Sequence, residues 1–227
     1  MRLRDDMDYQ RDTWLAYRDR TRAEDYARHH TERLTWARFA MWRERRGVER
    51  ALRRCHLSAR DTLVDLPCGT GILGDVLARF PARVIAADVS HEMMDLARNS
   101  YDPTKLGGFI QTDITGTCFR TGAFTGAVTI GLMHRLPSDI RRQAVAELAR
   151  FARRFVIMSC SIDSHGQRMK RWLLRRLRST YRPAPSPLRL AAMIEELRRH
   201  GLKVVTVFRV VPFLSAEVVL LLEKQSG

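Results

Sequence analysis

A glycine turn between two acids carries the strongest chemical signal in the sequence. The stretch 62–77, TLVDLPCGTGILGDVL, places Asp65 at the end of a short apolar run, and Gly69 and Gly71 lie in the turn that follows. Glycine permits positive φ angles and lets a ligand approach the backbone with no Cβ in the way. The amides that open the next helix carry the positive end of its dipole. The stretch therefore predicts a buried strand, a tight turn that holds a ligand, and a helix.

The glycine spacing by itself fits two classes of ligand. Gly69, Gly71 and Gly74 spell G-x-G-x-x-G, the pattern of dinucleotide sites, and Asp88 follows as an acid that could bind ribose. The second class is S-adenosylmethionine (SAM), which carries an ammonium and a sulfonium. Asp65 favours the second class, because a carboxylate at the strand end would attract those two cations and repel a pyrophosphate.

The sequence D-L-P-C-G-T-G at 65–71 resembles motif I of class I SAM-dependent methyltransferases, which usually reads D-x-G-C-G-T-G. Pro67 replaces the first glycine of that motif. Proline fixes φ at about −65° and has no amide hydrogen to donate to a ligand. We interpret the stretch as a variant of the motif, and the alternative is a site that has lost its ligand. The resemblance covers residues 60–223.

The resemblance implies SAM as the cofactor and no metal. It implies that Asp88 accepts hydrogen bonds from the ribose hydroxyls, that Met93 packs against the adenine, and that Asp113 accepts from the adenine amino group. For these three residues the alternatives are a turn or helix-cap aspartate, an ordinary core methionine and a solvated loop aspartate. The cofactor-binding residues expected from the resemblance are Asp65, Pro67, Cys68, Gly69, Thr70, Gly71, Asp88, Val89, Met93, Asp113, Ile114 and Gly131.

His134 is the candidate catalytic residue. It follows an apolar strand at 123–130, in the sequence GLMHRLP, and in the family this strand end faces the transferred methyl group. A histidine there could act as a general base toward an acceptor hydroxyl or amine. The alternative is a histidine that only shapes the pocket. The sequence contains no N-P-P-Y or D-P-P-Y motif, which argues against methylation of adenine N6.

The elements that must position these residues alternate between strand and helix. Strands are expected at 62–66, 83–88, 108–111, 123–130 and 155–159, and helices at 71–79, 139–154 and 187–200, with Ser90 and Ser186 as helix caps and Gly201 as a helix stop. Two final strands, 203–211 and 216–223, read as a hairpin. The expected fold class is α/β: a doubly wound, seven-stranded, mostly parallel sheet with a C-terminal antiparallel hairpin and an N-terminal helical cap.

The expected domains are a helical cap or lid at 1–55 and a methyltransferase domain at 56–227. The cap reads as helices over 8–55 with a break at Gly47. By resemblance such a cap covers the substrate side of the cofactor. The residues that could line it are Tyr17, His29, His30, Trp36 and Arg46, and the alternative is that these helices only pack on the sheet.

A basic helical insertion is expected at 160–187. Its segment 167–181 has Met169, Trp172, Leu173 and Leu177 on one helical face, and residues 166–182 include seven basic residues and no acid. This segment predicts either a lid over the substrate or a helix lying on an anionic membrane. The formal net charge of +15 over 227 residues favours polyanionic partners, so nucleic acid is not excluded.

The sequence predicts a cytoplasmic protein, because its four cysteines are scattered without a C-x-x-C pattern and its N-terminus lacks a signal-peptide core. If the segment 167–181 lies on a membrane, the protein would be peripheral on the inner membrane face. The function expected is methyl transfer from SAM to a small-molecule or lipid-like acceptor. Orientation of the reactants alone can supply roughly 7–11 kcal/mol of the barrier to such a displacement. The alternatives are an RNA methyltransferase, an NAD-dependent enzyme, and a non-catalytic binding or assembly protein that kept the fold.

Overall fold

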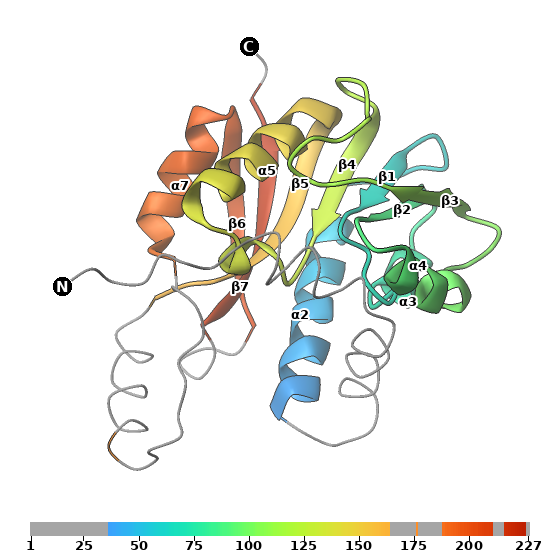
Figure 1. The fold of residues 1–227 in the computed structure, drawn as a ribbon, viewed down its shortest axis with the longest axis horizontal. Coiled ribbons are helices and arrows are strands. Elements are labelled where there is room, and N and C mark those ends of the chain that lie inside the picture. The colour runs from blue at the N-terminus through green and yellow to red at the C-terminus, as the bar shows by residue number, and fades with distance from the viewer. Residues whose placement is uncertain (1–35, 164–175, 177–187, 211–215, 226–227) are drawn as a thin grey trace.

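Seven strands form one sheet in the order β3-β2-β1-β4-β5-β7-β6 (Figure 1). The computed structural model describes residues 36–163, 176, 188–210 and 216–225. The strands are β1 (Thr62–Asp65), β2 (Arg83–Asp88), β3 (Leu106–Gln111), β4 (Phe124–Thr129), β5 (Ala152–Ser161), β6 (Leu202–Arg209) and β7 (Glu217–Lys224). The first five pair with one another in parallel, and β7 is antiparallel to both β5 and β6. The expected fold class is confirmed.

Helices cover both faces of the sheet. One face carries α2 (Trp36–Arg53), α3 (Gly74–Leu77) and α4 (His91–Ala97), and the other carries α5 (Ser138–Phe151) and α7 (Leu190–Arg199), which lie together in Figure 1. Two short 3-10 helices, η2 (Arg98–Ser100) and η3 (Met133–Arg135), follow α4 and β4. Each strand contributes alternate residues to two cores, because successive side chains point to opposite faces. Val64 and Ala127 lie in the α5–α7 core, whereas Leu63 and Val128 lie in the α2–α3–α4 core.

Several helix boundaries differ from the expectation. The helix expected at 71–79 is only the four residues of α3. α5 ends at Phe151, not at 154, because Arg153 and Arg154 already belong to β5. Their guanidinium groups donate to the Thr125 hydroxyl (3.0 Å) and to the Cys55 carbonyl (2.9 Å), and these bonds hold the start of the strand.

The last helix also begins later than expected. α7 starts at Leu190, after Leu188 has formed a bridge with Ile162, and Ser186 lies outside the described residues. Two local predictions hold. The Ser90 hydroxyl accepts from the Met93 amide (3.1 Å) and caps α4, and Gly201, with φ of 71°, follows the end of α7.

The sequence predicted a helix break at Gly47. In the structure Gly47 lies inside α2. A Cβ at this position would lie 3.0 Å from Val219 Cγ2 on β7. The glycine therefore allows α2 to approach the sheet closely. No helix in the described part of the chain is both long and apolar enough to cross a bilayer.

Candidate functional site

The strand order reverses at β1, which lies between β2 and β4. β2 leads outward to β3 on one side, and β4 leads to β5 on the other. The connections at the carboxyl ends of β1 and β4 therefore diverge to opposite faces, and such a switch point opens a crevice in α/β proteins. The turn after β1 and the turn after β4 border this crevice, and both contain predicted site residues.

Hydrogen bonds fix the turn after β1. The Leu66–Pro67 peptide is cis. The Cys68 amide donates to the Ala87 carbonyl of β2 (2.8 Å), and the Gly71 amide donates to the Cys68 carbonyl (2.9 Å). Gly69 has φ of 52°, and a Cβ added to it would meet no atom within 4 Å. The turn is thus held rigidly while Gly69 faces open space, as a ligand-binding glycine must.

The other two glycines of the G-x-G-x-x-G pattern serve packing. A Cβ on Gly71 would lie 2.5 Å from the Ser100 Cβ, and one on Gly74 would lie 1.9 Å from the Ser100 carbonyl oxygen. The segment that follows α4 therefore lies directly against the start of α3. The Ser100 hydroxyl also donates to the Thr70 carbonyl (3.3 Å). Only the first glycine of the pattern is left open to a ligand.

Asp65 carries a buried carboxylate next to this turn. Its Oδ2 accepts from the Tyr101 hydroxyl (2.7 Å), and its Oδ1 has no hydrogen-bond partner among the described residues. Burial raises the pKa of Asp65 to about 7; the Tyr101 hydrogen bond opposes this rise, and the negative charge of Asp88 adds to it. An unpaired buried carboxylate oxygen is costly and favours a nearby cation. The site therefore fits a ligand that carries positive charge.

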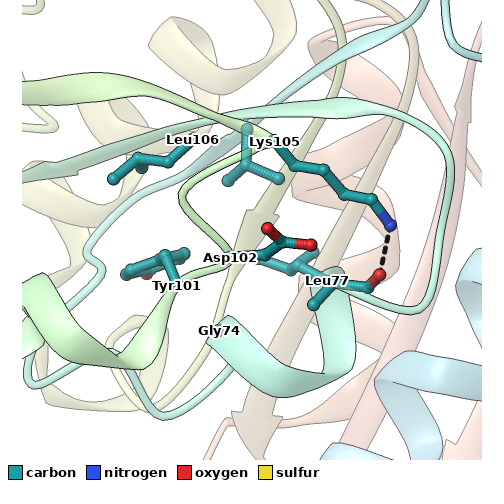
Figure 2. Close-up of a pocket in the computed structure, with 8 residues that line it drawn as sticks. Gly74, Leu77, Tyr101, Asp102, Lys105 and Leu106 are labelled. Carbon is teal, nitrogen blue, oxygen red and sulfur yellow. Dashed lines mark hydrogen bonds between the residues drawn. The ribbon is translucent and has the colours of Figure 1, made fainter.

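Tyr101 is a site residue that the sequence analysis missed. Besides its bond to Asp65, its ring lines a small hollow with Gly74, Leu77 and Leu106 (Figure 2). The polar groups of the hollow are paired within the protein. Lys105 donates to the Ala78 carbonyl, and Asp102 accepts from Thr104. The hollow is thus lined by α3, the start of β2 and the segment that leads into β3.

Asp88 joins the end of β2 to the glycine turn. Its Oδ2 accepts from the Gly69 amide (2.8 Å) and its Oδ1 from the Ser90 amide (2.9 Å). Burial raises the pKa of this carboxyl, and the amide bonds oppose the rise. The turn role considered as an alternative is therefore present. Each oxygen keeps a second lone pair, so the ribose role stays a prediction.

The remaining cofactor residues of the prediction flank this region. Met93 and Cys68 are buried, and burial raises the pKa of the Cys68 thiol. The Val89 carbonyl accepts from the Gln111 side chain (3.0 Å). Asp113 Oδ1 accepts from the amide and hydroxyl of Thr115 (both 2.8 Å), which is a turn role, and its predicted contact with adenine is untested. Ile114, which follows, is buried in the α5–α7 core.

The turn after β4 contains Gly131 and His134. Gly131 has φ of 69°, faces open space as Gly69 does, and donates its amide to the Ser159 hydroxyl of β5 (2.8 Å). His134 lies in η3, and its Nδ1 is buried without a partner among the described residues. Burial, with a smaller effect of Arg135, lowers the pKa of His134 to about 4. The imidazole is therefore neutral at pH 7, and its lowered pKa makes it a weaker base than an ordinary histidine.

The predicted lid is only partly described. Tyr17, His29 and His30, and the side chain of Trp36, lie outside the described residues, as do 164–175 and 177–187 of the predicted insertion. The first residues of that insertion, Cys160 and Ser161, extend β5. Arg46 lies on the exposed side of α2, with its guanidinium 4.9 Å from the centre of the Trp42 ring.

Comparison with known proteins identifies the central part of the chain. Residues 63–154 match a family model described as a methyltransferase domain. This part of the chain is similar to that family. It contains the glycine turn, Asp88, the turn after β4 and α5, and the methyl donor of the family is SAM. The resemblance and the cofactor expected from motif I are thereby confirmed, and the variant residue Pro67 lies within the matched part.

Solved structures extend the likeness to the whole fold. Magnesium protoporphyrin IX methyltransferase from Synechocystis PCC 6803, with bound SAH (the demethylated product of SAM), is similar at a TM-score of 0.75 and 13% identity, over 95% of this chain and all of its own. The SAM-bound structure of the same enzyme has a TM-score of 0.74 and 14% identity, over 98% of this chain and all of its own. A TehB-like SAM-dependent methyltransferase from Corynebacterium glutamicum ATCC 13032 gives 0.62 and 17%, over 91% of this chain and all of its own. The search of curated proteins gives no match.

Proposed function

We propose that this methyltransferase transfers the methyl group of SAM to a small-molecule or lipid-like acceptor at the carboxyl edge of the sheet. The observation that carries the proposal is the buried Asp65 carboxylate beside the open Gly69 turn, because its Oδ1 has no hydrogen-bond partner among the described residues. The likeness in fold to a magnesium protoporphyrin IX methyltransferase, over 95% of this chain, supports a small-molecule acceptor.

SAM, when bound, supplies an electrophilic methyl carbon and its own leaving group. The chain then has to bind and orient the reactants and to exclude water from them. Asp65 would balance the positive charge of the ligand, and Asp88 would hold the ribose. His134, neutral and with Nδ1 unpaired, would take the proton that an acceptor hydroxyl or amine releases.

Two of the alternatives lose support from this geometry. An NAD-dependent enzyme would place a pyrophosphate over Gly69, next to the Asp65 charge. RNA methylation rests on net charge alone. A non-catalytic protein of this fold would bind SAM without turnover, and the experiment below separates that case.

We predict membrane contact through residues 167–181, which lie outside the described residues. With this contact the protein would be cytoplasmic and peripheral on the inner membrane face, and this too stays a prediction. Sedimentation with anionic and neutral liposomes tests it. Salt-sensitive binding to the anionic vesicles, lost on substitution of Trp172 by alanine, would support it, and equal sedimentation of the two proteins would refute it.

The central test has two steps. Titration calorimetry with SAM, SAH and NAD should give micromolar binding of the first two and none of the third. Protein with methyl-labelled SAM and host extract should then yield a labelled small molecule, identified by mass spectrometry. Binding of NAD alone would overturn the proposal. Binding of SAM without any labelled product would favour the non-catalytic alternative.

A further inference from the structure

A charged side chain interrupts the buried face of α2. The described part of this face is otherwise apolar or glycine: Ala40, Gly47, Val48, Ala51 and Leu52. Glu44 lies in the same stripe, one turn before Val48, and only 9% of its surface is exposed. Among the described residues, no basic side chain forms an ion pair with it within 4.0 Å. A buried carboxylate without a cation costs free energy, so its position calls for an explanation.

The packing of α2 fixes Glu44 at the carboxyl edge of the sheet. Gly47, one turn later, allows close contact with Val219 of β7. Arg43 Nε donates to the Val210 carbonyl (2.8 Å) just after β6. In Figure 1, α2 extends from the end of the sheet toward which the arrow of β4 points. Glu44 is therefore held in place by contacts on both sides of it along the helix.

Groups from three other elements face the Glu44 carboxylate. They are Ser159 of β5, Glu217 of β7 and Arg135 of η3. Burial, and next the charge of Glu217, raise the pKa of Glu44 to about 7, while the Ser159 hydroxyl and then Arg135 lower it. Burial also raises the pKa of Glu217. The charge of Arg135 therefore does not offset the effect of burial at Glu44.

Ser159 connects this carboxylate to the crevice. Its oxygen accepts from the Gly131 amide (2.8 Å), which leaves its own proton free to donate to Glu44. Gly131 belongs to the turn after β4, and its missing Cβ would point into open space. Hydrogen bonds therefore link Glu44 through Ser159 to Gly131 in the turn after β4, which borders the crevice, and Asp65 lies on the β1 side.

We propose that Glu44 and Ser159 bind the acceptor, and that the acceptor carries a protonated amine which pairs with the Glu44 carboxylate. This inference rests on the proposed methyl transfer and adds the chemical class of the acceptor. A cationic group would pair with the buried Glu44 carboxylate and favour its ionised form. The amine anchors the acceptor, and Glu44 is a binding residue that touches substrate.

Calorimetry with three probes of equal chain length tests the inference: octylamine, octanol and octanoate, each titrated into the SAH-bound protein at pH 7. Octylamine should bind at least tenfold more tightly than the other two. Glu44 is half protonated at pH 7 when its pKa is about 7, so amine binding should release about 0.5 proton. Titrations in two buffers with different ionisation enthalpies measure this release.

Two variants provide the controls. Glu44→Gln keeps the shape of the side chain and should weaken octylamine binding at least tenfold and abolish the proton release. Glu49→Gln makes the same change on α2, where Glu49 pairs with Arg53 and Arg79, and should bind octylamine like the wild type. SAH binding by each variant shows that it is folded.

The outcomes separate the two proposals. Failure of the wild type to bind SAH would refute the proposed function itself. If the wild type binds SAH, three results would refute the amine site and leave the proposed function standing. They are no preference for octylamine, no binding of any probe, and an equal response in Glu44→Gln.

Discussion

Replacing Asp65 by asparagine should stabilise the ligand-free protein at alkaline pH. The pKa of Asp65 rises from 3.8 to about 7 on folding, chiefly because the carboxyl is buried. The neutral form of Asp65 contributes favourably to the free energy of unfolding. This contribution is complete below pH 3.8 and is lost as the pH rises through 7, because Asp65 ionises freely in the unfolded chain. A shift of about three pKa units corresponds to about 4 kcal/mol. Asparagine stays neutral, and its carbonyl oxygen can still accept from Tyr101.

Urea unfolding of the ligand-free wild type and Asp65→Asn at pH 5 and pH 8 measures this effect. The stability advantage of the variant should grow by roughly 2–3 kcal/mol between the two pH values, the part of the loss that falls in this interval. Glu44, Glu217 and Asp88 titrate in both proteins, so their contributions largely cancel in the difference. Asp139→Asn, at an exposed aspartate in the first turn of α5, should show no such growth.

Ligand binding should move in the opposite direction. Asp65→Asn should bind SAM at least tenfold more weakly, because the variant lacks the carboxylate that faces the cationic ligand. If the stability advantage of the variant is constant or shrinks from pH 5 to pH 8, the assignment of Asp65 as a buried acid with a raised pKa is refuted. Unchanged SAM affinity would refute its role in binding the ligand.

Three further predictions follow from the site. Gly74→Ala should lower the free energy of unfolding by more than about 3 kcal/mol, since the new Cβ would meet the Ser100 carbonyl at 1.9 Å; urea unfolding measures it, and a loss below 1 kcal/mol would contradict the packing role. Asp88→Ala should weaken SAM binding by about 1.5–3 kcal/mol in calorimetry, and unchanged affinity in the folded protein would leave Asp88 only its bonds to the Gly69 and Ser90 amides. His134→Ala should reduce turnover less than about 100-fold, because orientation supplies most of the rate, whereas a loss of about 10⁴-fold with SAM binding intact would identify a general base.

Local patterns in the sequence were sufficient for the architecture. The apolar run before Asp65 predicts β1, Ser90 predicts the cap of α4, and Gly201 predicts the end of α7, because each depends on residues within one turn or strand. The alternation of strands and helices then predicts a parallel sheet, and the two closing strands predict the hairpin of β6 and β7. Motif I identified the family for the same reason, since its seven residues are consecutive.

Helix boundaries depended on packing between distant residues. Gly47 has the sequence signature of a helix break, yet contact with Val219 keeps it inside α2. Gly71 and Gly74 match a ligand-binding pattern, yet both lie against Ser100. Glycine removes a Cβ for either purpose, and the sequence does not specify what occupies the space.

The chemistry of the site was decided by pairs of residues far apart in the chain. Tyr101 lies 36 residues from Asp65, and no spacing rule links them; only the packing of the segment after α4 against α3 brings the hydroxyl to the carboxylate. Glu44 carried one signal in the sequence, a charge in the apolar stripe of a helix. Its neighbours Ser159 and Glu217 come from strands at the other end of the chain, and burial between these elements sets its pKa. The sequence by itself therefore determined the fold and the family, because both follow from local patterns, whereas the tertiary structure decided which polar groups are buried, paired or left unpaired at the site.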